Sequence, residues 1–198
     1  MKQVKGGELL KIFYTASYFG KEKYQAYYDL IREALSEMSV TVVSPEVGNY
    51  LLVLPEEVKA RLKDPKAIHY EAIKRGIALS DAVIIEVSQE DFQLGHEATL
   101  AIMEKKPVLC LSLYEDFSKK IKHDFFFASQ YKKVTIRSTI QDFLAKVREM
   151  SLARRFNMFL YPQQVEYLAQ TSKQQGLNMS EYMRLLINRD RFIAGKEK

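Results

Sequence analysis

The chain has 198 residues, of which 47% are hydrophobic and 28% charged, a composition that excludes a disordered or fibrous protein. At about 150 residues per domain, this length predicts one full domain and a surplus of roughly 50 residues. The formal net charge of +5 is uneven, because residues 151–198 hold +4 and residues 1–150 hold +1. A basic tail on a near-neutral body favours a phosphate-rich partner for the tail.

No apolar run approaches the ~20 residues that a membrane-spanning helix needs, and residues 1–5 lead into no signal-peptide segment. We therefore expect a cytoplasmic protein with no membrane partner. Cys110 is the single cysteine, and His69, His96 and His123 are isolated from one another. The sequence therefore implies no disulfide, no metal and no cofactor.

Residues 1–150 alternate predicted strands and helices. The expected strands cover residues 11–17, 39–43, 82–87, 107–113 and 133–136. The expected helices cover residues 21–38, 68–79, 94–104 and 138–152, and residues 44–66 are the longest irregular segment. Because the runs at 82–87 and 107–113 are apolar throughout, they indicate strands buried on both faces. The fold class is therefore α/β, a doubly wound, mainly parallel five-stranded sheet of the flavodoxin or Rossmann type.

Ligands of open α/β sheets bind beyond the carboxyl ends of the strands, so the loops after Ser17, Val87 and Leu113 are the candidate site. Glu97 falls in the first turn of the helix that follows the loop after Val87, where the helix dipole favours a carboxylate. Gly95 permits a close approach of the backbone to a ligand or a neighbour. The simpler alternative is that Glu97 only decorates a helix N-terminus.

The segment Ser80-Asp-Ala-Val-Ile-Ile-Glu-Val-Ser is followed by Leu94-Gly-His-Glu-Ala-Thr-Leu-Ala-Ile and Lys105-Lys-Pro-Val-Leu-Cys-Leu. This order resembles the core of the nucleoside 2-deoxyribosyltransferase superfamily, which includes the 2'-deoxynucleoside 5'-monophosphate N-hydrolases. Residues 11–20 resemble the first strand of that family and its Gly/Ser turn. The motifs span roughly residues 8–115, and the domain that they imply extends to about residue 148.

The resemblance implies cleavage or transfer at the N-glycosidic bond of a (deoxy)nucleoside or its 5'-monophosphate. Glu97 matches the family's nucleophile, a carboxylate that can trap an oxocarbenium-like carbon. Asp91 matches a carboxylate for base contact or protonation, and Glu71 matches another, with a plain surface-helix role as its alternative. Tyr14 is favoured over the aligned Phe13 as the sugar-contacting aromatic; successive strand residues face opposite sides, so only one can line the site.

Ser17 and Gly20 match the family's turn after the first strand, and with Gly95 they complete the predicted substrate site. Phe19 stands where the hydrolases have an arginine. This departure favours the alternative that the domain senses a nucleotide without turning it over. A catalytically inactive scaffold is a third possibility.

Residues 151–198 predict a separate module. Residues 154–161 alternate as a short amphipathic strand, Pro162 starts a helix that ends near Gly176, and Asn178 or Ser180 caps a second helix. This order resembles the ribbon-helix-helix repressor module over roughly residues 153–190. That module is a dimer, so the resemblance implies a homodimer or a higher even-numbered oligomer.

In such a module, the ribbon enters the major groove of duplex DNA. The predicted DNA-binding residues are Arg155 and Asn157, with Arg154 beside them and Ser180 at the N-terminus of the second helix. The alternative is that the ribbon only dimerises the α/β domain, with Phe159 buried. Two hypotheses follow: an enzyme with a dimerising or DNA-tethering tail, or a DNA-binding transcriptional regulator that senses a nucleotide.

Overall fold

The computed structural model describes residues 9–151 and 158–194. The chain divides into two compact units. One unit spans Leu9–Ala153, and the other contains the described residues from 158 onward.

The first unit is built around one five-stranded sheet. Its strands are β1 (Leu10–Ala16), β2 (Val40–Val43), β3 (Ala82–Glu86), β4 (Val108–Ser112) and β5 (Phe126–Gln130). The strand order is β2-β1-β3-β4-β5, and every neighbouring pair is parallel. This is the flavodoxin-like order, and it confirms the predicted doubly wound α/β fold with a parallel five-stranded sheet.

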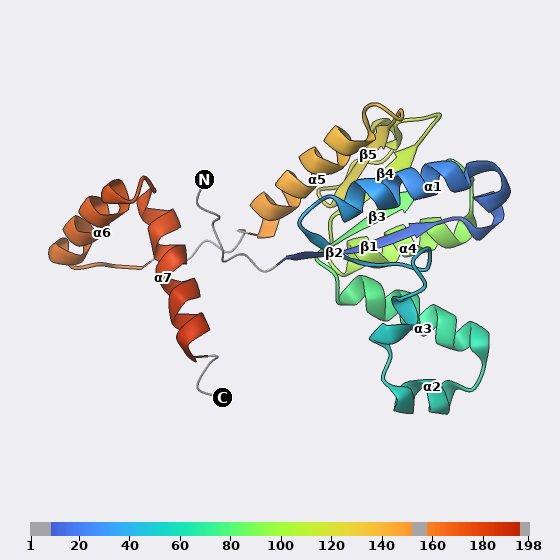
Figure 1. Ribbon diagram of the computed structural model, residues 1–198, viewed down its shortest axis with the longest axis horizontal. Coiled ribbons are helices and arrows are strands. Elements are labelled where there is room, and N and C mark those ends of the chain that lie inside the picture. The colour runs from blue at the N-terminus through green and yellow to red at the C-terminus, as the bar shows by residue number, and fades with distance from the viewer. Residues whose placement is uncertain (1–8, 152–157, 195–198) are drawn as a thin grey trace. The chain divides into compact units, whose positions relative to one another are not determined.

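Helices cover both faces of the sheet, with α1 and α5 on one face and α3 and α4 on the other (Figure 1). Their bounds are α1 (Lys21–Ser36), α3 (Pro65–Ala78), α4 (Phe92–Met103) and α5 (Ile136–Ser151). Shorter turns are η1 (Tyr18–Gly20), η2 (Tyr50–Val53), α2 (Glu56–Leu62) and η3 (Phe117–Lys119). The segment at 44–66, expected to be irregular, therefore contains two of these short helical elements.

The strands divide their side chains between two hydrophobic cores. Along β1, Ile12 and Tyr14 pack in the core under α1 and α5, whereas Phe13 packs in the core under α3 and α4. Along β3, Ile84 and Ile85 divide in the same way. Because strand side chains alternate, Glu86 at the end of β3 falls on the α1 and α5 side.

The fifth strand lies at residues 126–130, and the prediction of a strand at 133–136 was wrong. Lys132 N donates to Thr135 Oγ1 at 3.0 Å, and Ile136 N donates to Lys132 O at 3.1 Å. These bonds form a helical turn, so the buried Ile136 opens α5 instead of ending a strand. The β-branched residues of this stretch gave a strand-like pattern because a helix start and a short strand look alike over four residues.

The second unit is helical, with α6 (Pro162–Gln174) and α7 (Met179–Ala194) packed through Leu168 and Tyr182. Asn178 is the cap of α7, because its Oδ1 accepts from Glu181 N at 2.9 Å while Glu181 Oε2 accepts from Asn178 N at 2.8 Å. This is a capping box. Ser180 is exposed in the first turn of α7.

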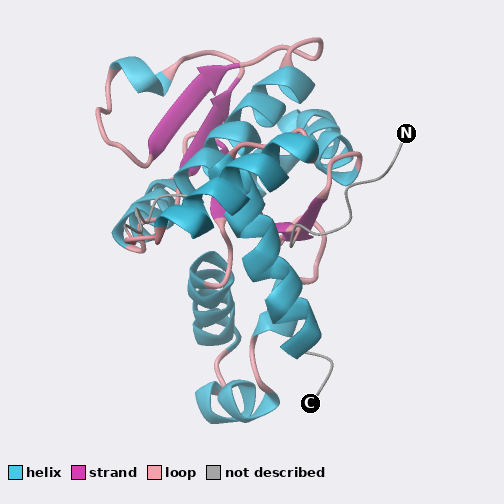
Figure 2. Cartoon of the chain, turned by 90° about the vertical axis from the view of Figure 1, so that its left-hand side faces the viewer, coloured by secondary structure: helices cyan, strands magenta, loops and turns pink. Residues whose placement is uncertain are grey.

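No strand occurs among the described residues of this second unit, and all the strands drawn in Figure 2 belong to the first. Residues 158–160 lead into α6 without pairing, and the side chain of Phe159 is fully exposed. The two helices of the predicted ribbon-helix-helix unit are therefore present, whereas its ribbon is not shown: residues 158–160 pair with no strand, and residues 154–157 lie outside the described residues. Three of the predicted DNA-binding residues, Arg154, Arg155 and Asn157, lie outside the described residues.

Candidate functional site

Four of the predicted site residues come together at the carboxyl ends of β1 and β3: Ser17, Gly20, Asp91 and Glu97. These two strands are neighbours, and the connections that leave them cover opposite faces of the sheet. This is the switch point of a doubly wound sheet, where the fold leaves room for a ligand or a partner.

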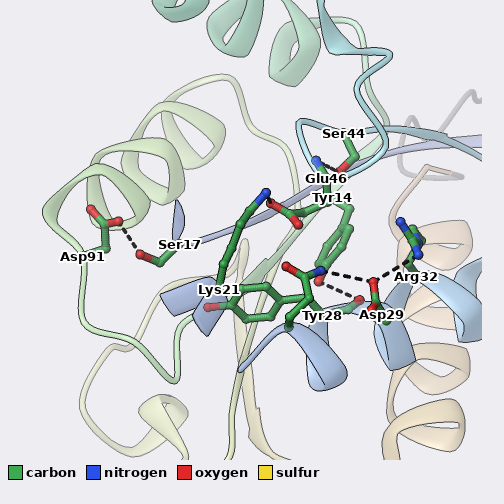
Figure 3. Close-up of polar contacts among 10 residues, drawn as sticks. Tyr14, Ser17, Lys21, Tyr28, Asp29, Arg32, Ser44, Glu46 and Asp91 are labelled. Atoms are coloured by element: carbon green, nitrogen blue, oxygen red, sulfur yellow. Dashed lines mark hydrogen bonds and ion pairs between the residues drawn. The ribbon is translucent and has the colours of Figure 1, made fainter. Parts of the chain in front are cut away.

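A hydrogen bond ties the loop after β1 to the start of α4 (Figure 3). Ser17 Oγ donates to Asp91 Oδ2 at 2.7 Å, and Asp91 Oδ1 accepts from Gln93 N at 2.9 Å. Asp91 is therefore the N-cap of α4, and both of its oxygens are engaged. In this structure Asp91 positions two loops.

The two predicted site glycines differ in their surroundings. Gly20 is buried, and a Cβ placed on it would collide with the Tyr28 hydroxyl and lie 2.8 Å from Gln89 Cβ. The absence of a side chain at Gly20 therefore lets the loop after β1 pack between α1 and the loop after β3. Gly95 is exposed, and a Cβ placed on it would meet no described atom within 4 Å.

Glu97 is a buried carboxyl group on the α3 and α4 side of the sheet, with 2% of its surface exposed. Its Oε1 accepts from Gln93 Nε2 at 3.0 Å, and its Oε2 has no hydrogen-bond partner among the described residues. Burial raises the pKa of Glu97 to about 7, while the Gln93 hydrogen bond and the Thr15 hydroxyl lower it and the charge of Asp91 raises it further. Such a group exchanges protons near neutral pH.

The hydrogen bonds continue from Glu97 into a pocket between α3 and α4. Gln93 Nε2 lies 3.3 Å from His69 Nε2, and His69 Nδ1 lies 2.9 Å from the Tyr50 hydroxyl. Burial lowers the pKa of His69, which keeps the imidazole neutral. The pocket has a volume of about 510 Å³ and is lined by Pro65, Lys66, His69, Tyr70, Phe92, Gln93 and His96.

A second buried carboxyl group, Glu86, lies on the opposite face of the sheet. Its Oε1 accepts from Ser88 N at 3.3 Å, from the Ser88 hydroxyl, and from the Tyr131 hydroxyl at 3.2 Å. Its Oε2 has no partner in the described part of the chain, and neither has the Tyr28 hydroxyl on the same face. Burial raises the pKa of Glu86. Because the sheet separates them, Glu86 and Glu97 do not form a carboxylate pair around one ligand.

The structure places the other predicted residues away from Glu97. Glu71 is half-exposed on α3, and its carboxylate lies 3.8 Å from Lys74 Nζ. Tyr14 is fully buried under α1, where its hydroxyl donates to Tyr28 O at 3.2 Å. Phe13 is fully buried against Gly76 on the other face. Both aromatic side chains of β1 are therefore core residues in this structure.

Exposed aromatic side chains surround the same edge of the sheet. Tyr18 and Phe19 follow β1, Phe92 opens α4 after β3, and Tyr114 follows β4. Their exposed fractions are 76%, 82%, 93% and 61%. We call these four residues the aromatic rim.

The pocket residues Gln93, His69 and Tyr50 were not predicted from the sequence. The i to i+4 spacing of Gln93 and Glu97 on one helix was the available signal for the first of them. His69 and Tyr50 come from other elements, and no local pattern connects them to Glu97.

Over residues 9–151 and 158–194, no group of three or more His, Cys, Asp or Glu side chains could hold a metal ion. Within the same residues, each helix is too short or too polar to cross a bilayer.

No family model matches the chain, and no curated protein matches it. Among solved structures, it is similar to the crystal structure of a prokaryotic SEFIR domain, at 15% sequence identity and a TM-score of 0.45. That match covers 76% of this chain and 99% of the SEFIR chain. At this level the likeness concerns the arrangement of strands and helices alone.

These comparisons correct the family resemblance that the sequence motifs indicated. No family model and no curated protein supports membership of the nucleoside 2-deoxyribosyltransferase superfamily, and that assignment was wrong. The prediction of an N-glycosidase or transferase activity, with Glu97 as nucleophile, depended on that assignment and was wrong as well. The DNA-binding regulator was also wrong, since it depended on the same resemblance and on a ribbon that the described residues lack. The motifs misled because a buried parallel strand, a loop and a helix-borne acid recur in many α/β folds.

Proposed function

We propose that the α/β domain is a protein-interaction domain that binds a second copy of this chain through the aromatic rim. The observation that carries this proposal is the exposure of four aromatic side chains above a backbone that is fixed beneath them. Isolated exposed apolar residues are common on protein surfaces, whereas a group of large ones marks an interaction site.

The backbone under the aromatic rim is held on both sides of the exposed residues. Ser17 is buried and bonded to Asp91, and Gly20 is buried between α1 and the loop after β3. Tyr18 and Phe19 lie between these two fixed points, so their side chains project outward together, with ring centroids 6.0 Å apart. The rim therefore has little freedom to lose on binding.

Phe92 is fixed in the same way, because it directly follows the cap residue Asp91. Tyr114 is held by a hydroxyl contact of 3.0 Å with Tyr24 on α1. Aromatic side chains on a rigid support are the usual anchors of protein interfaces, where each buries a large area at a low cost in conformational entropy.

The charges around the rim favour a second copy of the same chain over a highly charged partner. Lys23 is exposed in the first turn of α1 beside Tyr24 and Tyr114, Glu22 is exposed in the same turn, and Glu90 is exposed on the loop after β3. In a twofold interface the basic group of one copy meets the acidic group of the other. A surface that carries both signs around an aromatic centre is therefore complementary to itself.

The test is the association state of the full chain, measured by sedimentation equilibrium over a range of protein concentrations. We expect a dimer whose dissociation constant rises at least about tenfold when Phe19 and Phe92 are both replaced by Ser. The matched control is Met103→Ser, because Met103 is 75% exposed at the far end of α4, away from the rim. A monomer at all concentrations, or equal association of the double variant and the wild type, would overturn the proposal.

A further inference from the structure

The side-chain amide of Gln93 connects the buried carboxyl group of Glu97 to the pocket between α3 and α4. An amide group donates from its nitrogen and accepts at its oxygen, and the two ends exchange places when the group rotates by half a turn. The groups around Gln93 therefore decide which end faces inward and which end is left for a ligand.

When Glu97 is ionised, the available hydrogen-bond donors allow one arrangement of the Gln93 amide. An ionised Glu97 can only accept, so Gln93 Nε2 donates to Glu97 Oε1 at 3.0 Å and directs its other hydrogen to His69 Nε2 at 3.3 Å. His69 then carries its hydrogen on Nδ1 and donates it to the Tyr50 hydroxyl at 2.9 Å. In this arrangement Gln93 Oε1 accepts from no described residue and is free for a ligand.

When Glu97 is neutral, the Gln93 amide can be rotated by half a turn, and the hydrogen-bonding groups of the same four residues are again satisfied. A neutral Glu97 carries a hydrogen, and it can donate that hydrogen to Gln93 Oε1 once the amide has rotated. His69 then carries its hydrogen on Nε2, donates it to the same Oε1, and accepts from the Tyr50 hydroxyl at Nδ1. The imidazole stays neutral in both arrangements, and the free end of Gln93 is now its NH₂ group.

The groups that face Glu97 allow both charge states near neutral pH. Asp91 on the same helix is an acidic neighbour whose charge favours the neutral form. Thr15 from β1 is uncharged, and His69 from α3 reaches Glu97 through Gln93. Burial raises the pKa of Glu97 to about 7, so both forms are populated there.

The walls of the pocket suit a flat, uncharged molecule. Tyr70 and His96 stack on each other with ring planes 17° apart, and the Tyr70 hydroxyl lies 3.2 Å from His96 Nε2. Pro65 and Phe92 add apolar surface, and Lys66 is the charged group among the lining residues. A planar ring fits such walls, and one polar group on it can reach Gln93.

We infer that the pocket between α3 and α4 binds a small, neutral, planar ligand through the Gln93 amide, and that the charge state of Glu97 decides whether Gln93 accepts or donates. An ionised Glu97 selects ligands with an N–H donor, and a neutral Glu97 selects ligands with an acceptor. Phe92 lines this pocket and also belongs to the aromatic rim, so the two sites share one residue.

Two flat probes of similar size separate the two arrangements. Indole offers one N–H donor, and quinoline offers one ring-nitrogen acceptor. Binding to the full chain is followed by the NMR signals of the Gln93 side-chain amide, one pH unit below and one above the Glu97 pKa of about 7. We expect indole to bind about three- to tenfold more tightly at the higher pH and quinoline at the lower, as for one hydrogen bond gained or lost.

Two variants and a matched control complete the test. Glu97→Gln cannot ionise, so the pH dependence of both probes should disappear. Gln93→Leu keeps the bulk of the side chain without its amide, so both probes should bind more weakly at both pH values. The control is Gln170→Leu, because Gln170 makes the same i to i+4 contact with a glutamate, Glu166, on the exposed surface of α6.

Several results would overturn the inference. One is binding of neither probe at the pocket. Another is the same pH dependence for both probes, or a pH dependence that survives in Glu97→Gln. If Glu97→Gln does not fold, the Gln93 amide signals of the wild type decide: without a ligand they should shift with a midpoint near pH 7, and their constancy would exclude the reversal.

Discussion

Replacing Glu97 by Gln removes a carboxyl group whose pKa is raised by burial from 4.5 to about 7. Below pH 4.5 the group is protonated in the folded and unfolded chains alike. Between pH 4.5 and 7 the unfolded chain has lost the proton and the folded chain still holds it, so stability falls as the pH rises. Above pH 7 both are ionised and the loss is complete. The pKa difference corresponds to about 3 kcal/mol of unfolding free energy.

The assay is urea unfolding of the full chain at a series of pH values, followed by far-UV circular dichroism because the chain contains no tryptophan. The quantity compared is the stability of the wild type minus that of Glu97→Gln. This difference should fall by about 3 kcal/mol between pH 4.5 and 7 and stay level above that. Glu86 is present in both proteins, so its own titration cancels.

Glu71→Gln is the matched control, because Glu71 is half-exposed and pairs with Lys74 at 3.8 Å on the surface of α3. Its effect should stay below about 0.5 kcal/mol at every pH. A difference between wild type and Glu97→Gln that is independent of pH, or that grows as the pH rises, would refute the assignment of a buried, proton-binding Glu97.

Three further substitutions and modifications test the packing around the site. Gly20→Ala should lower the unfolding free energy by about 1–3 kcal/mol in urea titrations, because the new Cβ would collide with the Tyr28 hydroxyl; an unchanged midpoint would show that the loop can move aside. Asp91→Ala removes the α4 cap and the bond to Ser17, and it should cost about 1–2 kcal/mol and speed hydrogen exchange at the start of α4. Cys110 is buried and its pKa is raised to about 12, so iodoacetamide should react with it only at the rate of unfolding; fast labelling of the folded chain would contradict this burial.

Much of the sheet could be predicted from local sequence, because a strand that is buried on both faces has a continuous run of apolar residues. The apolar runs of β3 and β4 are each fully buried, as continuous hydrophobicity predicts for strands covered by helices. The same signal did not identify β5, where only Phe126 is fully buried and the next three residues are half-exposed. An edge strand has one neighbour and a weaker apolar pattern. The four residues at the start of a helix therefore looked more like a strand than β5 itself did.

The C-terminal module shows the same limit. The helices α6 and α7 follow from Pro162, Gly176 and Asn178, whose roles at helix ends are local. The strand expected before them needs a second strand to pair with. An alternation of three apolar residues does not show whether such a partner strand is present. The cap of α7, left open between Asn178 and Ser180, was decided by the reciprocal bonds between Asn178 and Glu181.

By itself, the sequence determined the alternation of strands and helices, the parallel sheet and the placement of Glu97 on the helix after β3, because each depends on residues near one another in the chain. The expectation that Glu97 lies in the first turn of that helix was wrong, because α4 begins at Phe92 and Glu97 lies in its second turn. The tertiary structure decided that Asp91 is a cap, that Tyr14 and Phe13 are core residues, and that Glu86 and Glu97 lie on opposite faces. It also brought His69 next to Gln93, 24 residues away. Such contacts form only when the helices pack on the sheet, so no local pattern records them.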